Sequence, residues 1–327
     1  MIGSSRLLGA LVGIMCTVLA PVAHGQGAGA KYPTKPIRLI VGFPPGGTTD
    51  VLARLVSARL STRLGQTIVV ENRAGASGMI GTDSVAKAAA DGYTLLFSSS
   101  TLATYRSLYA QVPFDPISDF APISLVASTP YVIVAHPTLP VGSVSDLVKY
   151  AHQYPGKITY AASVPGGGSH LAGELFKQRT KTDMLYVPYK GSGVILPDLL
   201  SGRLQMAIEN VTIMSQHVKS GAVKGIAVTG PKPSSLLPGV PTVSEDIPGF
   251  RVTGWFGIFA PAATPEPILQ VLSEAVMEVV SGKELRQRMA ELGAEPESGG
   301  RSDMRELLAS EIETWSAVIK EAGVKVE

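Results

Sequence analysis

The chain has 327 residues, 45% of them hydrophobic, with 28 Lys and Arg against 26 Asp and Glu and a formal net charge of +2. This near balance of charge gives no basic surface of the kind that nucleic-acid binding requires, so we expect no nucleic-acid partner. The length and hydrophobic content are typical of a well-packed α/β protein with two domains.

The N-terminal residues predict an exported protein. Arg6 precedes an apolar run over 7–20 that is too short to span a bilayer comfortably, and Ala23-His24-Gly25 supplies the small residues that a signal peptidase reads. We therefore predict a signal peptide over 1–25; an uncleaved membrane anchor is the alternative. The only cysteine, Cys16, lies in this segment, so the mature chain has no thiol for disulfides, catalysis or metal binding.

The first predicted strand and helix are joined by a glycine-rich turn. Ile37–Val41 is an apolar run typical of a strand, and Pro44-Pro45-Gly46-Gly47 ends it. Thr48, Thr49 or Asp50 can cap the helix that follows. A helix start at such a turn directs free backbone N–H groups to one point, which suits an anion. The alternative is an ordinary strand-to-helix connection.

Strands and helices alternate along the rest of the chain. The runs that predict strands are 67–71, 93–98, 123–127, 131–135, 158–162, 184–189, 205–209, 225–229 and 251–260, with Ser128-Thr129-Pro130 breaking 123–127 from 131–135. The runs that predict further helices are 79–89, 145–154, 170–179, 194–200, 211–219, one capped by Thr264 with Pro265 at its first position, 284–292 and 303–322. Such alternation implies parallel sheets with helices on both faces, arranged as two α/β lobes.

A second glycine-rich turn, over 163–170, joins another predicted strand to a helix. In open α/β sheets, ligands bind beyond the carboxyl ends of the strands, so lobes that face each other would bring both turns to one cleft. Two opposed helix N-termini suit a carboxylate or another small anion. Neither turn has the Gly-Lys-Ser/Thr of a phosphate-binding loop or a dinucleotide-binding pattern, so we expect no nucleotide cofactor.

The sequence gives little support for catalysis. His170 and Glu174 have metal-ligand spacing on one predicted helix, but no third ligand lies at a motif distance, which favours a structural role. The Gly-x-Ser-x-Gly nucleophile motif is absent around Ser169. Glu209 ends a predicted strand, where a cleft position and a buried, paired carboxylate both remain open. For Arg73 we favour a bracing role. We expect no catalytic residue, no metal and no cofactor.

A series of motifs in order carries a family resemblance. The motifs are Phe43-Pro44-Pro45-Gly46-Gly47 with Asp50, Glu71-Asn72-Arg73-Ala74-Gly75, Asp91-Gly92-Tyr93-Thr94-Leu95-Leu96, Asp115-Pro116 with Asp119-Phe120-Ala121-Pro122-Ile123, His170-Leu171-Ala172-Gly173-Glu174, Val187-Pro188-Tyr189-Lys190-Gly191, and Phe259-Ala260-Pro261. This series runs nearly the full mature length. It resembles the tripartite tricarboxylate transporter solute-binding proteins, the Bug-type periplasmic receptors for small carboxylates.

The resemblance implies two α/β lobes around a hinge, similar to type II periplasmic binding proteins. We expect lobe 1 to comprise 26–130 and 231–327, and lobe 2 to comprise 131–230. The resemblance also implies a periplasmic monomer that closes on a small carboxylate, without covalent chemistry, and docks to membrane permease subunits. The alternatives are a sensor that signals to a membrane kinase and an enzyme on the same scaffold.

The resemblance further implies that one ligand carboxylate lies between the two turns, held by backbone N–H groups, hydroxyls and ordered water. One arm of this clamp would comprise Phe43, Gly46, Gly47, Thr48 and Asp50, and the other Ser163, Gly166, Gly167, Gly168 and Ser169, with Ser98 and Ser99 also at the cleft. Neither turn contains Arg or Lys, so we expect geometry and hydrogen-bond count to set selectivity.

The sequence departs from the family pattern at positions where ligand identity could be set. We expect Tyr105, Arg106 and Glu209 to shape the distal half of the binding cavity. Leu102 and Tyr105 favour an aromatic or more apolar carboxylate. The alternative is that these positions are surface variation.

Overall fold

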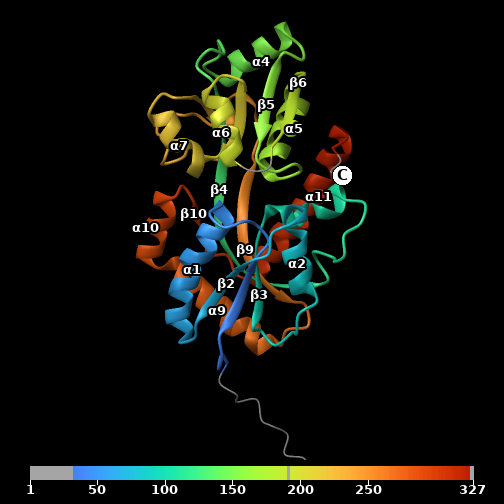
Figure 1. Ribbon diagram of the computed structural model, residues 1–327, viewed down its shortest axis with the longest axis vertical. Helices are drawn as coiled ribbons and strands as arrows, with labels where there is room; N and C mark the ends of the chain where they lie inside the picture. Colours follow the sequence, from blue (N-terminus) through green and yellow to red (C-terminus); the bar gives the residue numbers. More distant parts are fainter. Residues whose placement is uncertain (1–31, 190–191, 325–327) are drawn as a thin grey trace, which may run out of the picture. The chain divides into compact units, whose positions relative to one another are not determined.

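The computed structural model describes residues 32–189 and 192–324, and the predicted signal peptide over 1–25 lies outside them. No helix in these two ranges is long and apolar enough to cross a membrane. The fold is built from two mixed sheets that share one strand, with helices packed around both (Figure 1).

The first sheet has the strand order β2-β1-β3-β9-β4, and β10 also pairs with β4. Its strands are β1 (Ile37–Val41), β2 (Ile68–Asn72), β3 (Thr94–Ser99), β4 (Phe120–Ala135), β9 (Thr253–Pro261) and β10 (Glu295–Pro296). The accompanying helices are α1 (Thr48–Leu64), α2 (Met79–Ala86), α3 (Tyr105–Leu108), α9 (Glu266–Ser281), α10 (Lys283–Glu291) and α11 (Arg301–Ala322), with short 3₁₀ segments η1 (Ala76–Gly78) and η2 (Ser100–Ala103).

The second sheet has the order β4-β7-β5-β6, with β8 also paired to β4. Its further strands are β5 (Ile158–Ala162), β6 (Met184–Pro188), β7 (Met206–Asn210) and β8 (Lys224–Val228). Its helices are α4 (Val144–Gln153), α5 (Gly168–Thr180), α6 (Ser192–Leu200) and α7 (Val211–Lys219), and α8 (Val243–Asp246) lies in the connection back to the first sheet. Most predicted elements are confirmed with small shifts at their ends; the helix predicted over 79–89 stops at Ala86.

The expectation of two strands on either side of Ser128-Thr129-Pro130 is wrong, because β4 runs without a break through these residues. From Phe120 to Pro130, β4 pairs with β9, and from Tyr131 to Ala135 it pairs with β7 and β8. Pro130 has no N–H to donate to a neighbouring strand. The strand tolerates it because Pro130 lies where β4 leaves one sheet and enters the other.

The expectation of parallel sheets is correct only in part. β1 is parallel to β2 and β3, and β5 is parallel to β6 and β7. In contrast, β9 is antiparallel to β3 and β4, and β4 is antiparallel to β7, β8 and β10. The alternation of strands and helices along the chain does not determine which strands become neighbours, so it missed the antiparallel pairings made by the shared strand.

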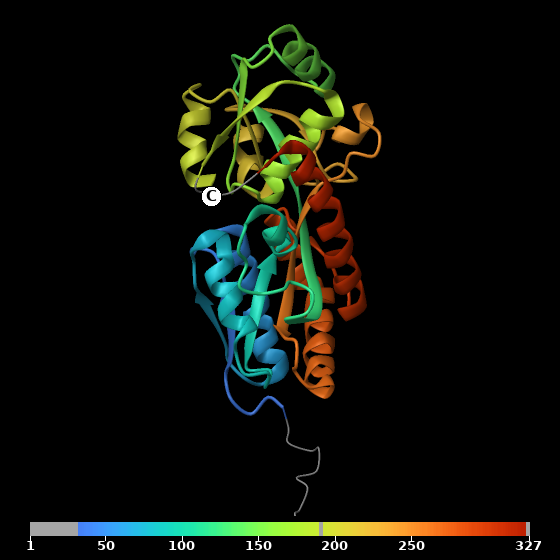
Figure 2. The ribbon, with the colours of Figure 1, turned by 90° about the vertical axis from the view of Figure 1, so that its right-hand side faces the viewer.

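Helix α11 connects the two halves of the hydrophobic core. It lies alongside β4 (Figure 2) and contacts α5 of the second sheet as well as η2 and α3 of the first. Leu308, Trp315 and Ile319 of this helix are buried in one cluster with Phe259 of the first sheet and with Phe176 of α5, which packs on the second sheet. The core is therefore continuous across both sheets.

Candidate functional site

A cavity of about 490 Å³ lies where the carboxyl ends of β1, β3, β5 and β7 meet. This is the position at which open α/β sheets bind ligands. Both glycine-rich turns contribute to it. The residues that line it are Phe43, Pro44, Pro45, Gly46, Gly47, Thr48, Thr49, Ser99, Ser100, Thr101, Tyr131, Ser163, Val164, Gly167, Gly168, Ser169, Gly193, Leu196, Asn210, Ile213, Gly254 and Phe256.

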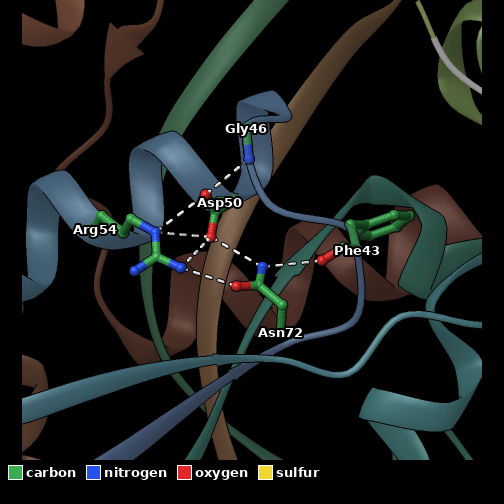
Figure 3. Close-up of polar contacts among 5 residues, drawn as sticks. All are labelled: Phe43, Gly46, Asp50, Arg54 and Asn72. Carbon is green, nitrogen blue, oxygen red and sulfur yellow. Dashed lines mark hydrogen bonds and ion pairs between the residues drawn. The ribbon is translucent and has the colours of Figure 1, made fainter.

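The first turn is held from behind by the carboxylate of Asp50 (Figure 3). Asp50 accepts hydrogen bonds from the Gly46 N–H at 3.0 Å, from Arg54 Nε at 3.0 Å and from Asn72 Nδ2 at 2.9 Å. Asn72 Nδ2 also donates to the Phe43 carbonyl at 3.0 Å, and its Oδ1 accepts from Arg54 at 2.8 Å. This network fixes the backbone on both sides of the turn.

The network also keeps Asp50 ionised. Burial alone would raise its pKa, but the hydrogen bonds from Arg54 and Gly46 outweigh burial and lower it. The expectation that Thr48, Thr49 or Asp50 caps α1 is wrong, since Gly47 occupies the N-cap position without a side-chain cap. Asp50 instead lies in the first turn of the helix, where its negative charge is favourable.

The second turn is held in the same way by a neutral histidine. The Gly166 N–H donates to His170 Nδ1 at 2.9 Å, so the ring carries its proton on Nε2, 3.8 Å from Glu174 Oε1. The ring stacks on Tyr186 with centroids 3.7 Å apart. Burial lowers the pKa of His170 to about 4, although Glu174 opposes that shift. Glu174 also accepts from Tyr160 at 2.6 Å.

The two turns have nearly the same backbone conformation. Gly46 and Gly166 both adopt the left-handed region, with φ of 84° and 73°. Gly47 and Gly167 follow as N-caps, with φ/ψ of −77°/166° and −76°/168°. Glycine is required at the first position of each turn because a side chain is strained at that φ. Each turn therefore presents the first N–H groups of a helix, which have no acceptor within the helix.

Tyr131 of β4 lies between two glycines at the cavity. A Cβ added to Gly168 would lie 2.3 Å from the Tyr131 hydroxyl oxygen, and one added to Gly254 would lie 2.7 Å from it. Neither glycine can carry a side chain unless Tyr131 moves. Burial raises the pKa of this hydroxyl, so it is protonated and able to donate a hydrogen bond at neutral pH.

Polar side chains contribute further donors to the cavity wall. The hydroxyls of Ser99 and Thr101 lie 3.0 Å apart at the start of η2. Asn210 lines the cavity, and its amide oxygen accepts from the Thr129 hydroxyl at 2.8 Å. The lining residues that the structure describes include no Lys, Arg, His, Asp or Glu.

Nine of the residues expected at the site line the cavity. They are Phe43, Gly46, Gly47, Thr48, Ser99, Ser163, Gly167, Gly168 and Ser169. They come from both turns and from the end of β3, so the structure brings the expected segments to one place. Their contact with a ligand stays a prediction.

Tyr105 and Arg106, expected in the distal half of the cavity, do not line it. Tyr105 is 1% exposed and its hydroxyl donates to the Ser77 carbonyl at 2.9 Å, behind the first turn. Arg106 points away to an ion pair with Asp115 at 2.7 Å. Both residues follow the end of β3 in sequence, which suggested a position in the cleft. The segment η2 lies between β3 and α3 and directs α3 away from the cavity.

Four other expected residues lie outside the lining of the cavity. Asp50 holds the first turn as described, and Gly166 packs against Leu108, which a Cβ on Gly166 would approach to 2.2 Å. Ser98 and Glu209 are buried, at 3% and 0% exposure. Each precedes a lining residue in its strand, and consecutive strand residues point to opposite faces. Alternation therefore turns both away from the cavity.

Thirteen lining residues were not among the expected ones. Pro44, Pro45, Thr49, Val164, Ser100 and Thr101 adjoin expected residues, so a wider reading of the same motifs would have included them. Tyr131, Gly193, Leu196, Asn210, Ile213, Gly254 and Phe256 come from elements that tertiary folding brings together. Two of these carried a sequence signal: Asn210 follows Glu209 at the end of a predicted strand, a cleft position, and Gly254 is a glycine inside a strand, which often marks close backbone approach.

His170 and Glu174, which have metal-ligand spacing but were expected to be structural, have other partners. His170 accepts from Gly166, and Glu174 accepts from Tyr160 and from Lys177 at 2.9 Å. Within 32–189 and 192–324, no group of three or more His, Cys, Asp or Glu is arranged to hold a metal ion. Arg73 pairs with Glu71 at 3.2 Å, a bracing contact within the first sheet.

A neutral cavity at the N-termini of two helices, where two sheets meet, suits the binding of a small anionic solute. Residues 52–324 match the family model described as the tripartite tricarboxylate transporter family receptor. The chain is 39% identical over 329 residues to protein BugT of Bordetella pertussis, covering 99% of each chain. The chain belongs to the tripartite tricarboxylate transporter receptor family.

Two solved structures are similar over the described fold. The Rhodopseudomonas palustris protein Rpa4515, solved with adipate, has a TM-score of 0.83 and 38% identity, covering 90% of this chain and all of that one. MatC of Rhodopseudomonas palustris, solved with bound malate, has a TM-score of 0.78 and 31% identity, covering 88% of this chain and all of that one. The predicted family and fold class are thereby confirmed.

Proposed function

We propose that this receptor captures a small carboxylate between its two glycine-rich turns. The observation that carries the proposal is the matched backbone of the turns at one cavity. The first N–H groups of α1 and α5 carry partial positive charge, so a carboxylate between them would accept hydrogen bonds from both helices. The hydroxyls of Thr48, Ser99 and Ser169 add donors that suit the same anion.

The ligands of two similar proteins support the choice of a carboxylate. Adipate and malate, named with the two solved structures, are both dicarboxylates. In this chain the described lining offers neutral donors, and a hydrogen bond to a charged acceptor contributes about 1.5–3 kcal/mol. Donor number and placement would therefore set selectivity.

We further propose that the ligand is enclosed by rotation of two lobes, lobe 1 over 26–130 and 231–327 and lobe 2 over 131–230. The change of pairing partners along β4 after Pro130 supports this division. The return connection passes close by, since a Cβ on Gly230 would lie 3.0 Å from Pro130 Cβ. Two adjacent crossings form a compact hinge, and rotation about it would move one turn toward the other.

The biological setting we propose is capture in the periplasm after removal of a signal peptide over 1–25. The closed, ligand-bound monomer would dock to the permease subunits of a tripartite tricarboxylate transporter. No covalent chemistry belongs to this function, because hydrogen bonding and closure suffice to bind and release the ligand.

Calorimetric titration with malate, adipate and their uncharged diamides tests the proposal. We expect binding of at least one acid and of neither diamide. Ser169→Ala would weaken binding of that acid by about tenfold or more, the equivalent of one hydrogen bond to a charged group. Ser310→Ala, an exposed serine on α11, is the matched control and would leave affinity unchanged. Binding of a diamide as tightly as its acid would contradict carboxylate recognition.

A further inference from the structure

A second, smaller cavity adjoins the first. It has a volume of about 140 Å³ and shares Gly46, Thr48 and Ile213 with the larger cavity. Its remaining wall comprises Val51 and Leu52 of α1, Thr212 of α7 and Leu292 just after α10. We call this smaller cavity the annex. Figure 1 shows α7 next to α10 and α1, the three elements that surround it.

The annex is mainly aliphatic where it extends beyond the first turn, with Thr212 as the polar exception in its wall. Val51, Leu52, Ile213 and Leu292 supply four aliphatic side chains to its wall. Leu52 is buried at 1% exposure, whereas Val51 is 36% exposed and Ile213 and Leu292 are partly exposed. Aliphatic surface left open at the edge of a binding cavity is surface that an apolar group would remove from water.

The segment after α10 lies close to α7 beside the annex. A Cβ on Gly293 would lie 3.2 Å from Thr212 Cγ2 and 3.3 Å from the Thr212 nitrogen. Gly293 also has a φ of 72°, a conformation that favours glycine. This close approach holds the segment that carries Leu292 against α7 at the wall of the annex.

We propose, on the basis of the proposed carboxylate-binding function, that the ligand has an apolar end that occupies the annex. An apolar protein cavity of about 150 Å³ accepts a benzene ring, so the annex matches a ring or a short aliphatic tail. The carboxylate lies at the turn formed by Gly46 and Thr48, and the chain or ring extends from there past Ile213. The substrate class is thus a carboxylate with an apolar end.

A series of straight-chain acids tests this assignment. Burial of each methylene contributes about 0.8 kcal/mol, or about fourfold in affinity, so hexanoate would bind about sixtyfold more tightly than propionate. We expect benzoate to bind as well. Calorimetric titration with propionate, butyrate, pentanoate, hexanoate and benzoate gives the hexanoate-to-propionate affinity ratio for each variant.

Two substitutions locate the effect in the annex. Val51→Trp fills it, and Leu292→Gln makes its wall polar without touching the larger cavity. Each would reduce the hexanoate-to-propionate ratio at least tenfold. Val271→Trp on α9 is the matched control, since Val271 is 38% exposed against 36% for Val51. The control variant would keep the wild-type ratio.

The outcomes separate this inference from the proposed function. A wild-type ratio near one, or a ratio unchanged in both annex variants, overturns the inference. If malate or adipate binds in that case, carboxylate capture stands while the apolar end does not. If none of the acids binds, the proposed function fails and the inference fails with it.

Discussion

Asp50 and His170 occupy the same position in the two turns. Each lies four residues after a left-handed glycine and accepts that glycine's N–H, at 3.0 Å from Gly46 and 2.9 Å from Gly166. One acceptor is an ionised carboxylate and the other a neutral imidazole. The same backbone geometry is thus stabilised by groups that respond to pH in different ways.

We predict that His170 makes the protein less stable in mild acid. Its folded pKa of about 4 lies below the ordinary 6.5, so between these values the unfolded chain holds more protons than the folded one. The contribution of neutral His170 to the free energy of unfolding is fully present above pH 6.5 and is lost as the pH is lowered toward 4. About two and a half pH units at about 1.4 kcal/mol each give a loss of about 3 kcal/mol.

Urea unfolding between pH 7 and pH 4.5 measures this loss. His170→Asn keeps a side-chain acceptor for the Gly166 N–H but cannot gain a proton, so its curve would be flatter in this range. The pKa values of carboxylates such as Asp50 and Glu71 are lowered, so their effect on the free energy of unfolding changes mainly below pH 4.5. Equal pH dependence in wild type and variant would remove His170 as the cause.

Asn72→Ala would loosen the first turn. The substitution removes the donor to Phe43 O and to Asp50 Oδ1, and it leaves Arg54 with one acceptor fewer. We expect a loss of about 1–3 kcal/mol in the free energy of unfolding and weaker carboxylate binding. Denaturant unfolding and calorimetric titration measure the two effects.

The control for Asn72→Ala is Arg203→Ala, which breaks an exposed ion pair to Asp198. An exposed ion pair contributes little, so the free energy of unfolding would change by less than about 1 kcal/mol. An Asn72→Ala protein with wild-type stability and affinity would show that the network behind the turn is dispensable.

Gly168→Ala would disturb both folding and binding, because its Cβ would lie 2.3 Å from the Tyr131 hydroxyl oxygen. Overpacking of this kind costs about 1–3 kcal/mol. Tyr131→Phe in the same chain removes the hydroxyl and would restore part of the stability. Gly193→Ala is the matched control at the same cavity, since its Cβ would meet nothing within 4 Å. Thermal unfolding of the four proteins tests this; equal midpoints for Gly168→Ala and Gly193→Ala would contradict the clash.

Tyr105 acts through stability rather than through ligand choice. Its hydroxyl and that of Tyr109 bind Ser77, which has a strained φ of 54°. Tyr105→Phe would cost about 1 kcal/mol for one hydrogen bond, and Tyr105→Ala about 3–5 kcal/mol for a large core cavity. The order of affinities among carboxylates would stay the same in Tyr105→Phe. A changed order of affinities would show that Tyr105 contributes to ligand selectivity.

The local parts of the site could be predicted from the sequence. Tight turns are predicted at Pro44-Pro45-Gly46-Gly47 and Gly166-Gly167-Gly168, because glycine readily adopts the left-handed backbone conformation that such turns need. The order of strands and helices places both turns at the carboxyl ends of strands. The hydrogen bonds that hold the first turn in place could not be predicted from the sequence. Asp50 was expected to face the ligand, and only the folded position of Asn72 and Arg54 gives it a supporting role.

The long-range parts of the site could not be predicted. Tyr131 lies beside Pro130, which indicated a break between strands, whereas the chain continues there from one sheet into the other. Ile213 and Phe256 reach the cavity through pairings of β7 and β9 that local periodicity does not encode. Arg106 shows the opposite error: it follows a strand end in sequence but η2 directs it to Asp115.

A crystal structure of the protein with bound adipate or benzoate tests the central claim most directly. We predict that a carboxylate of the ligand lies between the two turns, with its oxygens within about 3 Å of N–H groups at the start of both α1 and α5. A carboxylate bound to only one of the two helix starts, or bound outside the cavity, would contradict the two-turn clamp.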